Sequence, residues 1–194
     1  MSQYIFDNAA EQARQRFQSL EELYDPRTVH FLEATGVGPG WRCLEVGAGG
    51  GSIAAWLADR VGSSGHVLVT DIDPRHLDAL AEAGWPNVEV QRHDVGQDPL
   101  PAATFDLVHA RLVLIHVPQR EAALARLVAA LKPGGWIVVE DFDPVSSTVV
   151  FRQPTWKATR PTTPCGSRCA ASWTSMASIR PGAAASTSDS LPRA

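Results

Sequence analysis

A run of glycines between a short apolar strand and an amphipathic helix constrains this chain more than any other feature. Residues 41–46 are patterned as an apolar strand, residues 47–51 are Gly-Ala-Gly-Gly-Gly, and residues 52–61 carry apolar side chains at helical spacing. Glycine lets the backbone turn sharply and lets a ligand approach without a Cβ in the way. Free N–H groups at the start of the next helix favour a carboxylate or phosphate. The run predicts a ligand-binding turn, although a glycine-rich turn without a ligand has the same composition.

Strand-like and helix-like segments alternate through the first 151 residues. Besides the segments around the glycine run, the pattern predicts helices over 7–20, 26–35, 74–83 and 119–131 and strands over 66–70, 88–92, 105–110 and 136–140. Such alternation is typical of βαβ units, which build a mostly parallel sheet with helices on both faces. We expect a doubly wound α/β fold. Residues 1–40 would form an N-terminal helical lid and residues 41–151 the ligand-binding domain.

Acidic residues follow the second and third predicted strands, where ligands bind in open parallel sheets. Asp71 can accept hydrogen bonds from a ribose diol there. Asp94 can accept one from an exocyclic amine such as adenine N6, with Ile72 and Val95 flanking the base. Each acid also has a plainer interpretation, Asp71 as a turn-forming residue and Asp94 as a solvated loop residue.

The segment after the fourth predicted strand supplies the candidates for acid–base chemistry. His109 and His116 are the histidines expected nearest the cleft, and either is a candidate general base. The alternative for both is a packed or surface histidine. Arg111 is expected either to contact a ligand carboxylate or to form a surface ion pair.

Five stretches in this order resemble the class I S-adenosylmethionine-dependent methyltransferases. They are Leu44-Glu45-Val46-Gly47-Ala48-Gly49-Gly50-Gly51, then Asp71, then Asp94, then Phe105-Asp106-Leu107-Val108, and last Leu131-Lys132-Pro133-Gly134-Gly135. The glycine loop alone is weak evidence for this family. The ordered set of motifs, ending in Leu-Lys-Pro-Gly-Gly before a strand, is specific to it. The resemblance runs from about Trp41 to Asp143 and implies a Rossmann-like sheet.

The resemblance also implies a cofactor and its ligands. Gly47, Gly49 and Gly51 would wrap the methionyl and ribose part of S-adenosylmethionine, and Glu45 would orient the methionine amino group. Asp71 would hold the ribose hydroxyls, and Asp94 and Val95 would hold the adenine. Arg111 falls where the chain of the family passes the cofactor after the fourth strand. Tyr4 and Phe17 of the lid would face the cofactor. The methyl acceptor is expected to be a small molecule. A protein or RNA acceptor is the runner-up, and the acidic body of the chain argues against RNA.

Two other functions stay open. One is a non-catalytic methyltransferase remnant. The other is a nucleotide-dependent oxidoreductase, because Gly49-x-Gly51-x-x-Ala54 with Asp71 fits a loose dinucleotide-binding pattern.

Residues 152–194 differ in kind from the rest. Ala, Ser, Thr, Pro and Arg supply 31 of these 43 residues, with six basic residues against one acidic residue, whereas residues 1–151 carry 20 acidic and 11 basic residues. Such a composition cannot bury enough apolar surface to offset the entropy of ordering. We expect a disordered basic tail, a functional basic arm or the product of a shifted reading frame, and favour the last. The final strands of the family fold would then be missing.

Composition and the absence of targeting signals indicate where the protein works and what it binds. The net charge of −4 provides no basic surface for nucleic acid. No apolar run suggests a membrane-spanning helix or a signal peptide. We expect a cytoplasmic protein. Cys165 and Cys169 lack a second ligand pair, so no metal site is expected.

Overall fold

The computed structural model describes residues 11–142. The predictions for Tyr4 and for the tail with Cys165 and Cys169 lie outside the described residues. No helix within residues 11–142 is long and apolar enough to cross a membrane.

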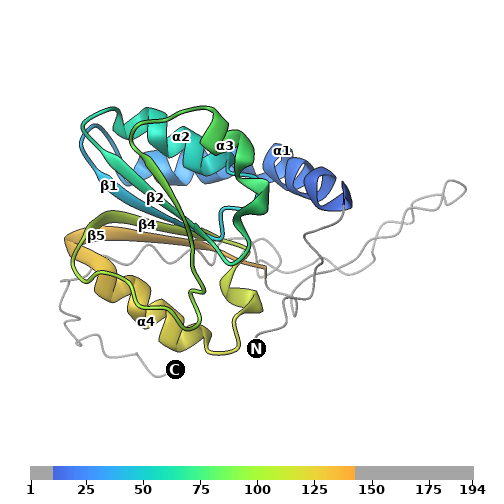
Figure 1. The fold of residues 1–194 in the computed structure, drawn as a ribbon. Helices are drawn as coiled ribbons and strands as arrows, with labels where there is room; N and C mark the ends of the chain where they lie inside the picture. The colour runs from blue at the N-terminus through green and yellow to red at the C-terminus, as the bar shows by residue number, and fades with distance from the viewer. Residues whose placement is uncertain (1–10, 143–194) are drawn as a thin grey trace, which may run out of the picture.

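Five parallel strands form one sheet in the order β3-β2-β1-β4-β5 (Figure 1). They are β1 (Arg42–Val46), β2 (His66–Asp71), β3 (Val88–Arg92), β4 (Phe105–Arg111) and β5 (Leu131–Glu140). The chain adds strands outward from β1 to β3 and then returns to the other side of β1. Val46 thus lies opposite both Thr70 and Ala110. This order confirms the Rossmann-like, doubly wound fold and places a crevice beyond the carboxyl ends of β1 and β4, where the winding reverses.

Helices cover both faces of this sheet, as predicted (Figure 1). The helices are α1 (Glu11–Ala34), α2 (Ser52–Val61), α3 (Asp78–Glu82) and α4 (Arg120–Ala130). Successive residues of β1 point to opposite faces. Cys43 packs with Leu32 of α1 and Leu57 of α2 in one core cluster, while Leu44 packs with Leu127 of α4 in the other. The two clusters explain why the central strands are nearly continuous runs of apolar residues.

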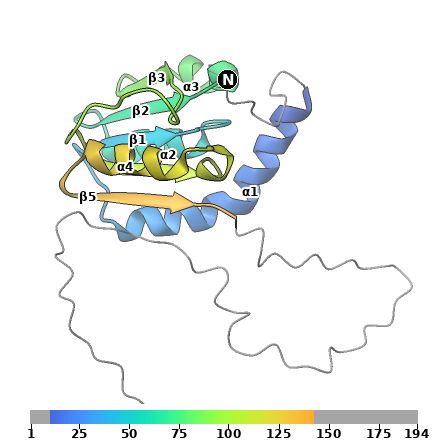
Figure 2. The same cartoon turned by 90° about the horizontal axis from the view of Figure 1, so that it is seen from below.

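One predicted break does not occur. The sequence pattern predicts separate helices over 7–20 and 26–35, yet α1 runs unbroken through Pro26. Proline lacks the N–H that would bond the Glu22 carbonyl, so it bends a helix more readily than it ends one when packing holds both halves. Figure 2 shows α1 changing direction along its length.

Two further boundaries differ from the prediction. The helix predicted over 74–83 is a 3-10 turn, Pro74–His76, followed by the short α3. The strand predicted over 136–140 already begins at Leu131, which pairs with Phe105 before an irregularity in the ladder. Gly134, with φ of +84°, lies in that irregularity. Within residues 11–142, β5 pairs with β4 alone.

Candidate active site

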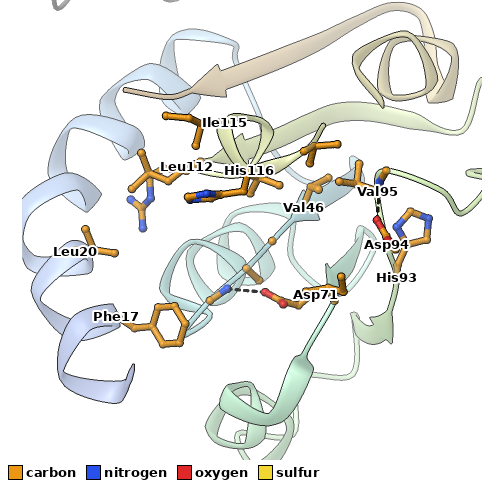
Figure 3. A pocket seen from close by; sticks show the side chains of 18 of the residues that line it. Phe17, Leu20, Val46, Asp71, His93, Asp94, Val95, Leu112, Ile115 and His116 are labelled. Carbon is orange, nitrogen blue, oxygen red and sulfur yellow. Dashed lines mark hydrogen bonds between the residues drawn. The ribbon is translucent and has the colours of Figure 1, made fainter. Parts of the chain in front are cut away.

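A cavity of about 370 Å³ opens at the carboxyl ends of the strands. Every strand has its C-terminal residue or following loop there, and α1 closes the cavity from the side (Figure 3). Figure 3 shows Phe17 and Leu20 of α1 at one end, and Asp94, Val95 and His93 at the other, with Asp71 between them. The cavity is therefore elongated, with chemically different ends.

The glycine run forms the floor of the cavity. Gly47 and Gly49 line it and adopt φ of +64° and +57°, a region that side chains rarely enter. A Cβ at Gly47 would collide with the Val113 side chain, and one at Gly49 would lie 3.2 Å from the Phe17 ring. Gly51 does not line the cavity. It is buried at the start of α2, where a Cβ would press on Leu77. Gly51 thus lets α2 pack closely, while Gly47 and Gly49 face the ligand space.

Asp71 is held beside this loop by backbone donors. Its Oδ2 accepts the Gly49 N–H at 3.1 Å and its Oδ1 accepts the Asp73 N–H at 2.9 Å. Burial raises the pKa of this carboxyl, and the two N–H donors partly offset that rise. Each carboxylate oxygen retains a further lone pair, so the group can still accept two hydroxyl donors from the cavity.

Asp94, Val95 and His93 lie at the far end of the cavity (Figure 3), and Ile72 also lines the cavity. The Asp94 carboxylate accepts the Gly96 N–H at 2.8 Å and the Gln97 side-chain N–H at 2.6 Å. His93 was not among the residues predicted from the sequence. His93 is 7% exposed, and its Nδ1 has no hydrogen-bond partner in the described part of the chain.

The wall formed by α1 was predicted only in part. Phe17 lines the cavity as expected, joined by Arg16, Leu20 and Glu21. These four residues lie on one side of the helix because they fall at i, i+1, i+4 and i+5. That spacing was visible in the sequence, but nothing local to it indicates which side of the helix meets the glycine loop.

His109 and Glu45 do not reach the cavity, contrary to the roles expected of them. They lie opposite one another on β4 and β1, buried under the helix layer that contains α1 and α2. His109 Nδ1 lies 2.6 Å from Glu45 and its Nε2 lies 3.2 Å from Glu140. Burial alone would lower the pKa of His109, but the two carboxylates outweigh it and raise the pKa to about 9. His109 is therefore a structural imidazolium at neutral pH.

Arg111 forms an ion pair, one of the two alternatives expected for it, but the pair is largely buried and not at the surface. Its side chain also lines the cavity, and its Nη1 donates to Asp25 at 2.8 Å and to Thr28 at 3.0 Å. Contact with a ligand carboxylate stays a prediction. Burial alone would raise the pKa of the neighbouring Glu140, but the hydrogen bond and charge of His109 outweigh burial, so the pKa of Glu140 is lowered. The charged residues thus tie α1 to the ends of β4 and β5.

His116 is the predicted histidine that lines the cavity. It ends a 3-10 turn, Leu114–His116, just after β4. The turn follows Leu112, which adopts φ of +58°, a strained value for a bulky residue. This backbone carries Leu112, Ile115 and His116 along one wall (Figure 3).

The cavity offers the groups that an adenosyl ligand needs. Apolar side chains such as Val95, the Asp71 carboxylate and the backbone of the glycine floor all line it.

Comparison with known proteins agrees with this geometry. Residues 43–135 match the model of the methyltransferase domain family. The chain is 37% identical over 103 residues to the methyltransferase str2 of Strobilurus tenacellus, covering 53% of this chain and 36% of that protein. It is 35% identical over 116 residues to the ubiquinone/menaquinone biosynthesis C-methyltransferase UbiE of Teredinibacter turnerae, covering 57% of this chain and 47% of that protein. The chain thus spans half or less of the length of these relatives.

Solved structures share the fold. A SAM-dependent methyltransferase from Aquifex aeolicus superposes with a TM-score of 0.63 at 25% identity, covering 77% of this chain and 79% of that one. An S-adenosylmethionine-dependent methyltransferase from Mesorhizobium loti gives a TM-score of 0.54 at 29% identity, covering 59% of this chain and 53% of that one. Residues 43–135, just under half of the chain, thus match the methyltransferase domain family, and the strand order and glycine floor are those of the Rossmann-like fold that binds S-adenosylmethionine in the similar solved methyltransferases.

Proposed function

We propose that this chain transfers a methyl group from S-adenosylmethionine to a small-molecule acceptor. The observation that carries the proposal is the position of Asp71, which accepts the Gly49 N–H of the glycine floor and lines the same cavity as Ile72 and Val95. The match to methyltransferases that carry biosynthetic names favours a small molecule over a macromolecule. The acidic body of the chain also disfavours RNA.

In the proposed complex, each cavity residue has a separate role. Asp71 accepts hydrogen bonds from the ribose hydroxyls, and Asp94 accepts one from the adenine amine. Ile72 and Val95 flank the base. S-adenosylmethionine, when bound, supplies an electrophilic methyl group on a sulfonium, which the acceptor displaces in line. Positioning of two reactants is worth roughly 7–11 kcal/mol, so the protein mainly orients them and excludes water.

His116 is our candidate for the general base. It lines the cavity, whereas His109 is charged and held between two carboxylates. A base is needed only where the acceptor arrives protonated. We expect His116→Gln to lower kcat for a protonated acceptor and to leave S-adenosylhomocysteine affinity unchanged.

Calorimetric titration with S-adenosylhomocysteine tests the cofactor part of the proposal. Asp71→Ala should weaken binding by about 1.5–3 kcal/mol, the range for hydrogen bonds to a charged group. Asp59→Ala, at an exposed position of α2, is the control and should bind like the unmodified chain. Equal affinity of the unmodified chain and Asp71→Ala would remove Asp71 from the site.

The same titration separates the competing functions. Tighter binding of NAD than of S-adenosylhomocysteine would favour the oxidoreductase. Absence of binding by a folded sample would favour the non-catalytic remnant, an alternative supported by the limited share of the relatives that the chain spans. Transfer of labelled methyl from S-adenosylmethionine into the protein or RNA fraction of an extract, rather than its small-molecule fraction, would contradict the proposed acceptor class.

A further inference from the structure

Among residues 11–142, three carboxylates line the cavity, and they come from different parts of the fold. Asp71 ends β2, Asp94 follows β3, and Glu21 belongs to α1. Asp94 lies at one end, beside Val95, and Asp71 lies near the middle (Figure 3). Glu21 lies on α1 one residue after Leu20, which marks the opposite end. The three acids are therefore spread along the length of the cavity.

Glu21 lies against the glycine floor. A Cβ at Gly50 would collide with its Oε1 and would lie 3.2 Å from its carboxyl carbon. The Ser52 backbone N–H, at the first turn of α2, also hydrogen-bonds to the Glu21 carboxylate. The carboxylate thus lies directly over the loop that follows β1.

The charge of Glu21 is costly in this position. Burial raises the pKa of its carboxyl, and the nearby Asp25 carboxylate raises it further. Arg111, the cation that opposes this effect, is itself hydrogen-bonded to Asp25. A cation arriving in the cavity next to Glu21 would offset both penalties.

Glu45 is unsuited to bind that cation. It is 3% exposed, does not line the cavity, and is paired with the His109 imidazolium at 2.6 Å. S-adenosylmethionine carries one ammonium, on its methionyl end, and that end must lie on the far side of the ribose from the adenine. If the adenine lies by Asp94 and the ribose by Asp71, the ammonium reaches the α1 end.

We infer that Glu21 of the lid helix, and not Glu45, is the carboxylate that binds the α-ammonium of the cofactor. The inference rests on the proposed use of this cavity for S-adenosylmethionine. It makes α1 a part of the cofactor site: the lid closes on the ligand through an ion pair as well as through Phe17.

Paired ligands test this inference. S-adenosylhomocysteine carries the ammonium, whereas methylthioadenosine retains the adenosine and lacks the amino-acid end. Glu21→Gln should weaken binding of S-adenosylhomocysteine roughly 10- to 100-fold, as expected for loss of a hydrogen bond to a charged group. Affinity for methylthioadenosine should change by no more than about twofold, equivalent to about 0.4 kcal/mol, because this ligand carries no ammonium for Glu21 to bind.

Two matched variants complete the experiment. Glu22→Gln removes the same charge one residue along α1 at an exposed position and should leave both affinities unchanged. Glu45→Gln should leave the ratio of the two affinities unchanged, even if it lowers the stability of the fold. Glu21→Asp, which retains the charge on a shorter side chain, should fall between the unmodified chain and Glu21→Gln.

The outcomes separate this inference from the proposed function. Equal losses for both ligands in Glu21→Gln would show a structural role at the start of α2 and overturn the inference. No loss for either ligand would also overturn it, as would a selective loss in Glu45→Gln. Failure of the unmodified full chain to bind either ligand would instead overturn the cofactor site itself, and the inference with it.

Discussion

At the scale of single residues, burial decides what a histidine or a glycine does. His109 and His116 are equal candidates in the sequence, but one is fully buried between Glu45 and Glu140 and the other lines the cavity. Burial removes water from the His109 imidazole and disfavours its charged form. His109 is charged because the Glu45 and Glu140 carboxylates compensate for the lost hydration. The neighbours that set this charge come from β1 and β5, far from His109 in sequence.

The charge of His109 makes stability depend on pH. Its pKa rises from an ordinary 6.5 to about 9 on folding, so the charged form stabilises the native state fully below pH 6.5. That stabilisation, on the order of 1–3 kcal/mol, is lost as pH rises from about 6.5 through about 9. Urea denaturation across this range should show the decline.

His109→Gln provides the control for this pH dependence. The variant should be less stable at pH 6.5 and should show a flatter profile up to pH 8.5. Cys43, whose pKa burial raises to about 12, adds a loss of stability only above its ordinary value of 9.0, outside the window used. An unchanged slope in His109→Gln would show that His109 is not the titrating group.

Gly47 and Gly62 form a matched pair for testing the glycine floor. Both have φ of +64°, but a Cβ at Gly47 meets Val113 and a Cβ at Gly62 meets nothing within 4 Å. Gly62→Ala should cost about 1–2 kcal/mol of unfolding free energy from backbone strain. Gly47→Ala should cost at least about 1 kcal/mol more through overpacking and should also weaken S-adenosylhomocysteine binding. Equal costs with equal affinity would contradict the close approach at Gly47.

At the scale of elements, α1 has two halves with different tasks. Thr28 and Leu32, after Pro26, are fully buried in the fold. Before Pro26, Phe17 and Glu21 cover the cavity. Asp25 next to the proline binds Arg111 of β4 and so fixes the point where the two halves meet. The bend lets one helix serve as both a core element and a lid.

Pro26→Ala tests whether the bend costs stability. Proline within a helix lowers the free energy of unfolding by about 3 kcal/mol relative to alanine. Proline also restricts the unfolded chain, which offsets up to about 1 kcal/mol of that loss. We expect Pro26→Ala to raise the unfolding free energy by about 1–2 kcal/mol, measured by urea denaturation, with weaker S-adenosylhomocysteine binding if the lid straightens. Glu22→Ala, at an exposed position, should change stability by less than about 0.5 kcal/mol. A destabilised Pro26→Ala would mean that the bend itself is needed for packing.

At the scale of the whole molecule, parallel strands bring distant residues to one edge. The carboxyl ends of all five strands lie at the same side of the sheet, so residues from Arg16 to Phe142 line one cavity. This part of the chain is acidic and well patterned, whereas residues 152–194 are basic and poor in large aliphatic side chains. The described residues that line the cavity all precede that change in composition.

A chain ending after residue 151 should therefore keep the cofactor site. We expect its affinity for S-adenosylhomocysteine to match that of the full chain within about twofold, equivalent to about 0.4 kcal/mol. Calorimetry on both forms makes the comparison. A large loss of affinity on removing residues 152–194 would show that the basic segment contributes to binding, and would count against its being the product of a shifted reading frame.

Local sequence patterns were enough to predict the alternation of strands and helices, the glycine turn after β1 and the acids after β2 and β3. These features are local, because apolar periodicity, glycine conformations and strand ends are set by neighbours in the chain. Three features depend instead on packing between elements: α1 continues through Pro26, Glu45 and His109 pair away from the cavity, and Glu21 lies over Gly50. Each of these depends on which side chains meet across elements, and burial then sets the charge and the access of each group. Local periodicity does not contain that information.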